Sequence, residues 1–295
     1  MIRLVRRLFD RRNDVHGEET RRRVERPQEK LIRQFSSLRE FRRSVLDRYA
    51  SFPCDALEIG AFTAPTVSPN EANIKFLDCF STTELVEKVR HSGGDPSAVV
   101  EVDYVCRDDN YVAVIKDTFD VIIANHVFEH IDHSIRWLQM MRTMLHQDGI
   151  LFLVLPDKKY SFDKFRPDTP VSHLLFEYLA EGQDVSTIHN FETALYYDLG
   201  YIGSSNDPNQ KLDLENLKRA IRPSHPGVHR HVFQAETFED RLMRPLLFTG
   251  LLDFELLEVE MCKQFGEFAI VFKAGRRNTE RSAGNLFQPA TDTIS

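Results

Sequence analysis

The chain of 295 residues is 42% hydrophobic and 11% aromatic, which is enough for a buried core, and its four cysteines form no C-x-x-C pair, which excludes a zinc–cysteine site and a disulfide framework. Residues 1–50 hold 15 basic and 8 acidic side chains, whereas the remaining residues hold 23 basic and 37 acidic side chains. An acidic body excludes duplex nucleic acid as a substrate, because phosphate binding needs basic side chains, and no apolar run is long enough to span a bilayer.

The basic N-terminal segment, residues 1–50, is predicted to be a helical extension. In residues 1–12, apolar side chains recur at helical spacing with arginines largely on the other side, which fits an interfacial helix on an anionic membrane and fits a solvated or partner-packed helix better. Residues 30–50 predict a helix that packs on the body. The segment lacks the apolar core of a signal peptide, so we expect a cytoplasmic protein, with peripheral contact at the inner face of the membrane as the alternative.

Two short strands with functional ends follow this segment. The run A-L-E-I-G predicts a buried strand that ends on Gly60, and K-F-L-D predicts a second strand that ends on Asp78. A glycine lets the backbone approach a ligand closely, and an acid at the tip of the next strand can bind a ribose diol. A dinucleotide motif would need glycine at Phe62 and a small residue at Pro65, so the pattern favours an adenosine-containing cofactor without phosphates.

The chain then alternates helices and strands, as a doubly wound parallel sheet requires. The predicted elements are a helix from the capping box Ser81–Glu84 to about His91, a third strand Val99–Asp103, a fourth strand Phe119–Asn125, a helix between Val127 and Leu145, and a fifth strand Ile150–Pro156.

The C-terminal part breaks this alternation. The predicted elements are a mainly helical insertion at 160–230, a last helix Thr237–Gly250, a closing antiparallel pair at 256–260 and 267–272, and a disordered tail at 276–295.

At this point the chain resembles the class I S-adenosylmethionine-dependent methyltransferases. The residues that carry the resemblance are L57-E-I-G60, Asp78, Asp103, F119-D-V-I-I-A-N125, F128-E-H-I131 and D148-G-I-L-F-L-V-L-P-D157. The runs L155-P-D-K-K-Y160 and S81-T-T-E84 look like a bacterial subgroup associated with surface-polysaccharide genes. The resemblance implies an α/β fold with a doubly wound, mostly parallel seven-stranded sheet in a domain spanning residues 51–275, with the insertion after strand five on the substrate side.

The first motif departs from the family pattern of two or three glycines. Only Gly60 remains, followed by Ala61, and the link to Ile74 is at the lower limit for a parallel connection. We therefore expect the methionine end of the cofactor to sit differently from the family norm.

The resemblance also implies which residues bind the cofactor, S-adenosylmethionine. These are Glu58, Gly60, Ala61, Asp78, Asp103, Tyr104 and Asn125. Glu58 is expected to order the methionine end, Asp78 to accept both ribose hydroxyls, and Asp103 with Tyr104 to meet the adenine amino group. Taken singly, each residue also has an ordinary structural explanation, such as a tight turn or a solvated acid at a strand end.

Two histidines are candidate catalytic residues. Methyl transfer needs alignment at contact distance, and a weak hydroxyl nucleophile benefits from a positioned base. His126 lies at the tip of strand four, where the methyl group is expected, and His231 precedes the last helix and can close the pocket. A surface or structural histidine is the alternative for each.

A metal site is the second interpretation of the same region. The spacing H-x-x-E-H matches the inverzincin pattern, but it straddles the end of a strand instead of lying within a helix, so protease function is rejected. Some metal-dependent O-methyltransferases carry E-x-x-E-H here, and by that resemblance a divalent ion would bind His126, Glu129 and His130 with His229 or His231. The alternative, that E-H only holds the loop, is favoured.

Basic residues flank the insertion within the acidic body and fit either a clamp for an anionic acceptor group or scattered solvated charges. They are Lys158, Lys159, Lys164, Arg166, Arg222 and Arg230. The predicted function is O-methylation of a saccharide or glycan-linked acceptor, where the glycan comes from the resemblance alone. The alternatives are a small aromatic or lipid-like acceptor and a non-catalytic scaffold.

Overall fold

The computed structural model describes residues 34–108, 110–180, 185–204, 211–212, 214–220 and 229–275. The chain divides into two compact units, Met1–Gln34 and Phe35–Ser295, and the described residues fall almost wholly in the second. The predictions for residues 1–12, Arg222 and the tail at 276–295 lie outside the described residues. In the described part of the chain, no helix is both long and apolar enough to cross a membrane.

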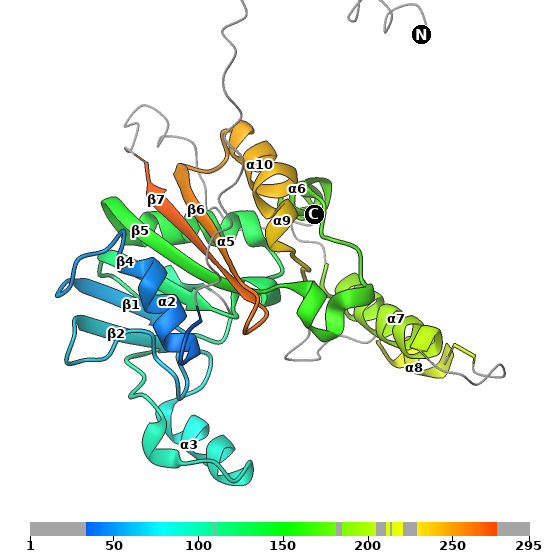
Figure 1. The fold of residues 1–295 in the computed structure, drawn as a ribbon, viewed down its shortest axis with the longest axis horizontal. Helices are drawn as coiled ribbons and strands as arrows, with labels where there is room; N and C mark the ends of the chain where they lie inside the picture. The colour runs from blue at the N-terminus through cyan, green and yellow to red at the C-terminus, as the bar shows by residue number, and fades with distance from the viewer. Residues whose placement is uncertain are drawn as a thin grey trace, which may run out of the picture. The chain divides into compact units, whose positions relative to one another are not determined.

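A seven-stranded sheet forms the centre of the second unit (Figure 1). Its strands are β1 (Asp55–Ile59), β2 (Asn73–Asp78), β3 (Tyr104–Val105), β4 (Phe119–Asn125), β5 (Leu145–Pro156), β6 (Phe254–Cys262) and β7 (Glu267–Ala274). The strand order is β3-β2-β1-β4-β5-β7-β6. The first five strands pair in parallel, and β7 is antiparallel to both β5 and β6. The predicted doubly wound, mostly parallel Rossmann-like fold is confirmed.

Helices and short 3-10 turns connect these strands. They are α2 (Leu38–Leu46), α3 (Thr82–His91), η1 (Pro96–Ala98), α4 (Tyr111–Val114), η2 (Phe128–His130), α5 (Ser134–Met144), η3 (Lys158–Tyr160), η4 (Phe162–Phe165), α6 (Val171–Leu179), α7 (Ser186–Ser204), α8 (Leu214–Ala220), α9 (Ala235–Thr237), the π-helical η5 (Phe238–Met243) and α10 (Arg244–Phe248). The capping box of α3 is present as predicted: the Ser81 side chain accepts from the Glu84 backbone, and Glu84 accepts from Ser81.

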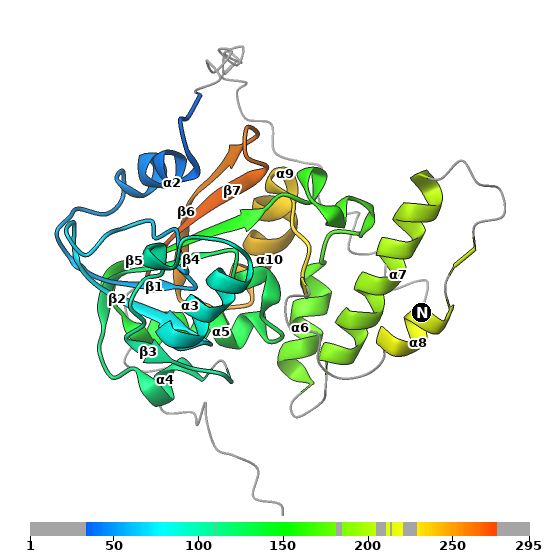
Figure 2. The ribbon, with the colours of Figure 1, turned by 90° about the horizontal axis from the view of Figure 1, so that it is seen from below.

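The two faces of the sheet bury separate apolar cores. Along β4, Ile122 packs in a core with Trp137 of α5, whereas its neighbour Val121 packs in a second core with Phe41 of α2. This alternation follows from the period-two geometry of a strand. Figure 2 shows α2 and α5 on opposite sides of the sheet. α2 lies within residues 30–50 and packs in this core, as expected of a helix that packs on the body.

The connection from β1 to β2 contains no helix, although all of its residues are described. Residues 60–72 form turns, and Gly60 donates its backbone N–H to the carbonyl of Leu77 at 2.9 Å. The link between the two strands is therefore too short for a crossover helix, which needs a longer connection.

The predicted third strand is wrong. Residues Val99–Asp103 lie outside any strand, and β3 begins one residue after Asp103. Pro96 starts a 3-10 turn just before, Val100 bonds to Phe62 O, and Val102 bonds to the Thr82 hydroxyl. The apolar residues of this segment predicted a strand, but hydrogen bonds to Phe62 and Thr82 hold the segment in place without strand pairing.

Candidate active site

The carboxyl ends of the parallel strands form one edge of the sheet, and the strand order reverses between β1 and β4. Ligands of doubly wound sheets bind at such a switch point. Ile59, Asp78 and Asn125 end β1, β2 and β4 at this edge. The structure therefore brings the predicted glycine turn, the ribose acid and Asn125 to the same place.

Gly60 is required at the end of β1 by its backbone. Its φ of 70° lies in the left-handed region, and a Cβ added there would lie 3.1 Å from the Cγ2 atom of Val127. Ala61, which follows, is buried. The chain can therefore pass close to the loop after β4, which narrows the switch point on one side.

Glu58 organises this edge from inside. The side chain is fully buried, and its two oxygens each accept from the backbone N–H of Thr66 at 2.9 Å, with Val67 N–H at 3.4 Å from one of them. Burial raises the pKa of Glu58 to about 7, against the lowering effect of these hydrogen bonds. Glu58 thus fixes the loop after β1, and it is not a solvated acid.

Asn125 completes this network from β4. Its Nδ2 donates to Glu58 Oε1 at 3.0 Å and to Thr66 Oγ1 at 2.8 Å. This fixes the amide orientation and leaves its buried Oδ1 without a hydrogen-bond partner among the described residues. An unpaired acceptor at the switch point fits the ammonium group of S-adenosylmethionine. Sequence reasoning missed Thr66, because no local motif marks it.

Asp78 lies at the end of β2 as predicted, and the N–H of Phe80 holds one of its oxygens at 2.9 Å. That bond orients the carboxylate at the edge where a ribose would lie.

Asp103 and Tyr104 do not lie at this edge. The Asp103 carboxylate accepts from Phe76 N–H and from Lys75 Nζ, both at 2.8 Å, beside the middle of β2. The Tyr104 hydroxyl donates to Asp117, which precedes β4. Among the described residues just beyond the carboxyl end of β3, Asp108 carries a carboxylate, which accepts from Cys106 and Asn110. Asp108 was missed because the third strand was predicted too early.

His126 has a different environment from the one expected of a base. Its Nε2 lies 2.9 Å from Glu267 Oε2, and its Nδ1 lies 3.5 Å from Glu129 Oε1. Arg42 also pairs with Glu267 through two hydrogen bonds. Burial alone would lower the pKa of His126, but the two carboxylates outweigh it and raise that pKa to about 9. At neutral pH the ring therefore carries its proton and cannot accept another.

The backbone N–H of His231 binds the carbonyl of Glu129 in the loop after β4, but the His231 side chain lies inside the helical insertion. It is fully buried beside His173, Glu177 and His189. Burial lowers the pKa of His231 to about 3, so the ring is neutral. A side chain enclosed in this way does not face an acceptor, and the predicted catalytic role of His231 finds no geometric support.

Only some of the residues of the predicted metal site lie together. Glu129, His130 and His229 bring one ligand atom each within 4.8 Å of one another, while His126 is held by Glu267. His229 Nδ1 also lies 2.6 Å from Asp163 Oδ2. Two arrangements are therefore built beside the loop after β4: a possible three-ligand group and a histidine oriented by a buried carboxylate.

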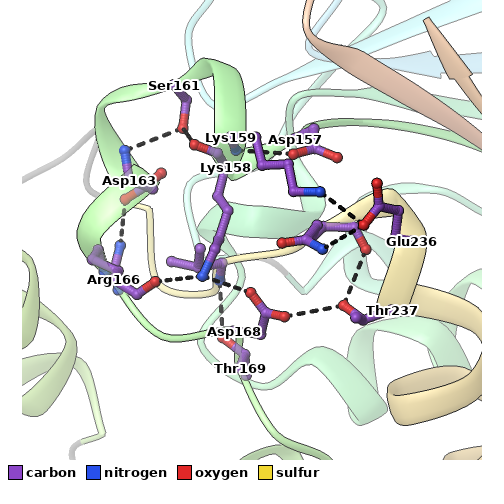
Figure 3. A network of polar contacts seen from close by, with 12 residues as sticks. Asp157, Lys158, Lys159, Ser161, Asp163, Arg166, Asp168, Thr169, Glu236 and Thr237 are labelled. Atoms are coloured by element: carbon purple, nitrogen blue, oxygen red, sulfur yellow. Dashed lines mark hydrogen bonds and ion pairs between the residues drawn. The ribbon is translucent and has the colours of Figure 1, made fainter. Parts of the chain in front are cut away.

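The basic residues around the insertion are largely paired with acids, as Figure 3 shows for the segment after β5. Lys158 binds Asp168 at 2.8 Å, and Lys159 binds Glu236 at 2.7 Å. Arg166 is paired with Asp163 and Arg230 with Asp132, while Lys164 lies over the ring of Phe165. These cations hold the insertion together. They are therefore not a group of unpaired charges that would suggest a clamp for an anionic acceptor.

A hollow of about 260 Å³ opens beyond the end of β5. Four carboxylates line it, from Asp157, Glu236, Glu239 and Asp240, together with the lysines Lys159 and Lys263 and with Tyr160, whose side chain is half exposed. Glu236 is paired with Lys159, and Glu239 and Asp240 are paired with Arg244, so these charges are largely balanced within the protein. The remaining lone pairs of the carboxylate oxygens accept hydrogen bonds from hydroxyl groups, so the lining suits a neutral, hydroxyl-rich ligand.

The sheet order and the polar edge at its switch point define a class I S-adenosylmethionine-dependent methyltransferase. A family model described as a methyltransferase domain matches residues 54–244, and the chain belongs to that family. It is therefore an enzyme that takes its methyl group from S-adenosylmethionine. A search among curated proteins finds no match to the sequence.

Solved structures of methyltransferases are similar to this chain at low sequence identity. A S-adenosylmethionine-dependent methyltransferase from Clostridium acetobutylicum is 12% identical, with 79% of this chain and 88% of that one covered and a TM-score of 0.40. One from Aquifex aeolicus is 11% identical, with 79% and 89% covered and a TM-score of 0.40. The plantazolicin methyltransferase BpumL in complex with SAH is 10% identical, with 80% of each chain covered and a TM-score of 0.40.

Proposed function

We propose that the enzyme transfers the methyl group of S-adenosylmethionine to a hydroxyl oxygen of a saccharide or glycan-linked acceptor. The observation that carries the proposal is the hollow beyond β5, whose lining is rich in carboxylates. The L-P-D-K-K-Y run, whose resemblance suggested a saccharide, ends at Tyr160 in the wall of this hollow. An exposed tyrosine ring offers a flat apolar surface with a polar tip, which suits a sugar ring.

The acceptor needs no negative charge. Lys158, Lys159, Arg166 and Arg230 are each paired with a carboxylate of the protein, so a phosphate bound by one of these four side chains would compete with an existing ion pair. This favours a neutral sugar ring at the reacting end of the acceptor. Two exposed rings in the segment after Tyr160, Phe162 and Phe165, support the alternative of an aromatic or lipid-like acceptor.

The bound cofactor supplies an electrophilic methyl group, and the chain's own residues position the reactants. Glu58, Thr66 and Asn125 hold the loop at the switch point in one conformation, and Asp78 faces the ribose position. We assign the base to His229, because Asp163 orients its ring and because His126 is already protonated at neutral pH.

The test is incubation with labelled S-adenosylmethionine and a panel of nucleotide sugars, cell-envelope glycans, small aromatic hydroxyl compounds and lipids. We expect label only in the saccharide fractions. Glu236→Gln should raise the KM for the saccharide, whereas Glu87→Gln, an exposed change on α3 away from the hollow, should not. Label in the aromatic or lipid fraction alone would overturn the proposal.

A further inference from the structure

Four side chains from three segments meet inside the helical insertion. His173 and Glu177 lie one turn apart on α6, His189 lies on α7, and His231 lies in the segment before α9. Residues four apart on a helix share one face, so α6 presents an imidazole and a carboxylate to the same point. One ligand atom from each of the four residues lies within 4.8 Å of the other three.

The distances show convergence on the Glu177 carboxylate. The Nε2 atoms of His173 and His189 lie 2.8 Å and 2.7 Å from Glu177 Oε1, and His231 Nε2 lies 3.5 Å from Oε2. The three ring centroids form a nearly regular triangle with sides of 5.0, 5.1 and 5.7 Å. Ligand atoms around a tetrahedral zinc ion lie about 3.3 Å apart. This value falls within the range of the three nitrogen–oxygen distances, 2.7 to 3.5 Å.

The cluster is buried and its polar atoms lack ordinary hydrogen bonds. Glu177 is 1% exposed, and His189 and His231 are 0% exposed. Among the described residues, both oxygens of Glu177 and all four ring nitrogens of His189 and His231 have no hydrogen bond of good geometry. The short separations therefore reflect atoms aimed at a common centre, since donor–acceptor alignment is missing. Buried polar atoms require a partner, and one nitrogen of each ring together with the Glu177 carboxylate can share a single ion.

A purely ionic cluster explains these contacts poorly. One or two protonated rings would neutralise Glu177, but three rings at about 5 Å would repel one another if protonated, and a neutral ring donates from only one nitrogen. A divalent cation satisfies all four ligands at once, because neutral imidazole and carboxylate are both donors to it.

We propose that His173, Glu177, His189 and His231 hold a zinc ion that fixes the insertion. Three imidazoles and one carboxylate suit zinc, and four protein ligands fill a tetrahedral site without an open position, which is typical of a structural metal. The ion links α6, α7 and the segment that follows residue 229. The site lies inside the insertion, where the backbone of His231 binds Glu129 of the loop after β4, and it does not depend on the identity of the acceptor.

The experiment uses untagged full-length protein. Metal analysis of the purified enzyme is expected to find about one equivalent of zinc per chain, and Glu177→Gln and His189→Gln should each lose most of it. A chelator should lower the melting temperature of the wild type, and added Zn²⁺ should restore it.

A second measurement places the ion even if those variants fail to fold. In cobalt-substituted wild-type protein we expect visible d–d bands of tetrahedral intensity, and His173→Cys should keep the metal and add a thiolate-to-cobalt charge-transfer band. His130→Cys is the matched control, because His130 belongs to the neighbouring group with Glu129 and His229. A charge-transfer band in His130→Cys alone, or wild-type protein that takes up neither zinc nor cobalt, would overturn the proposal.

Discussion

Asn125 on β4 donates its side-chain amide to Glu58 on β1 across 3.0 Å, which joins the two central strands at the edge where the sheet order reverses. The same amide reaches Thr66 in the loop after β1. Two strands and one loop therefore share a single buried carboxylate. The conformation of the cofactor-binding edge depends on the state of Glu58, and this dependence is measurable.

Stability should fall with rising pH because of Glu58. Its folded-state pKa of about 7 lies above its ordinary value of 4.5, so between these values the folded protein binds more protons than the unfolded one. The Glu58 contribution is therefore greatest below pH 4.5 and declines by roughly 3 kcal/mol as pH rises to 7. Urea unfolding of wild type and Glu58→Gln across this range should show the decline in the wild type only. Parallel curves would contradict the raised pKa.

Asp78 and Asp103 should behave differently although both were predicted to bind the cofactor. Asp78→Ala should weaken S-adenosylmethionine binding by about 1–3 kcal/mol in titration calorimetry, the range for a lost charged hydrogen-bond acceptor. Asp103→Ala should leave the affinity nearly unchanged and lower the melting temperature, because Asp103 holds Phe76 and Lys75 on β2. Equal losses of affinity in the two variants would show that Asp103 does bind the cofactor.

Gly60→Ala should be destabilising for two separable reasons. A left-handed φ costs a non-glycine residue about 1–2 kcal/mol, and the new methyl group would crowd Val127 at 3.1 Å. Removing the crowding with Val127→Ala in the same chain should recover only part of the loss, because the backbone term remains. Chemical denaturation of the single and double variants measures both terms, and full recovery would mean that φ contributes nothing.

The two histidine candidates should separate in turnover. His126→Gln should reduce turnover by less than about tenfold, because a protonated ring accepts no proton, whereas His229→Gln should reduce it by about 10²–10⁴-fold with cofactor affinity unchanged. Asp163→Asn should lower turnover in the same direction by disorienting His229. Single-turnover rates with labelled cofactor provide the measurement, and a large loss in His126→Gln alone would restore His126 as the base.

The sequence predicted the parts of the fold that are locally encoded. Apolar runs ending on Gly60, Asp78 and Asn125 gave the correct strands, and the capping box at Ser81 gave the correct start of α3. The third strand failed because β3 has only two paired residues, and its place is set by pairing with β2, which no local pattern reveals.

The sequence predicted the position of a site residue only where that residue lies at the end of a strand. The raised pKa of His126 depends on Glu129, which lies three residues along the chain, and on Glu267, which lies 141 residues away. The burial of His231 depends on His173 and His189, which no spacing rule joins to it. Long-range packing decides whether a histidine acts as a base, a cation or a ligand.

The absence of a helix between β1 and β2 bears on which molecules inhibit the enzyme. Residues 60–72 supply turns, so no helix dipole points at the carboxylate of the methionine half, an interaction worth about 0.3–1 kcal/mol where it occurs. The carboxylate of the cofactor product should accordingly add little to its affinity. The enzyme should therefore gain little on that side from binding the full product in place of a truncated thioadenosine that lacks the amino-acid end. A competitive inhibitor of this enzyme therefore needs the nucleoside and an ammonium group for Asn125 more than it needs the carboxylate.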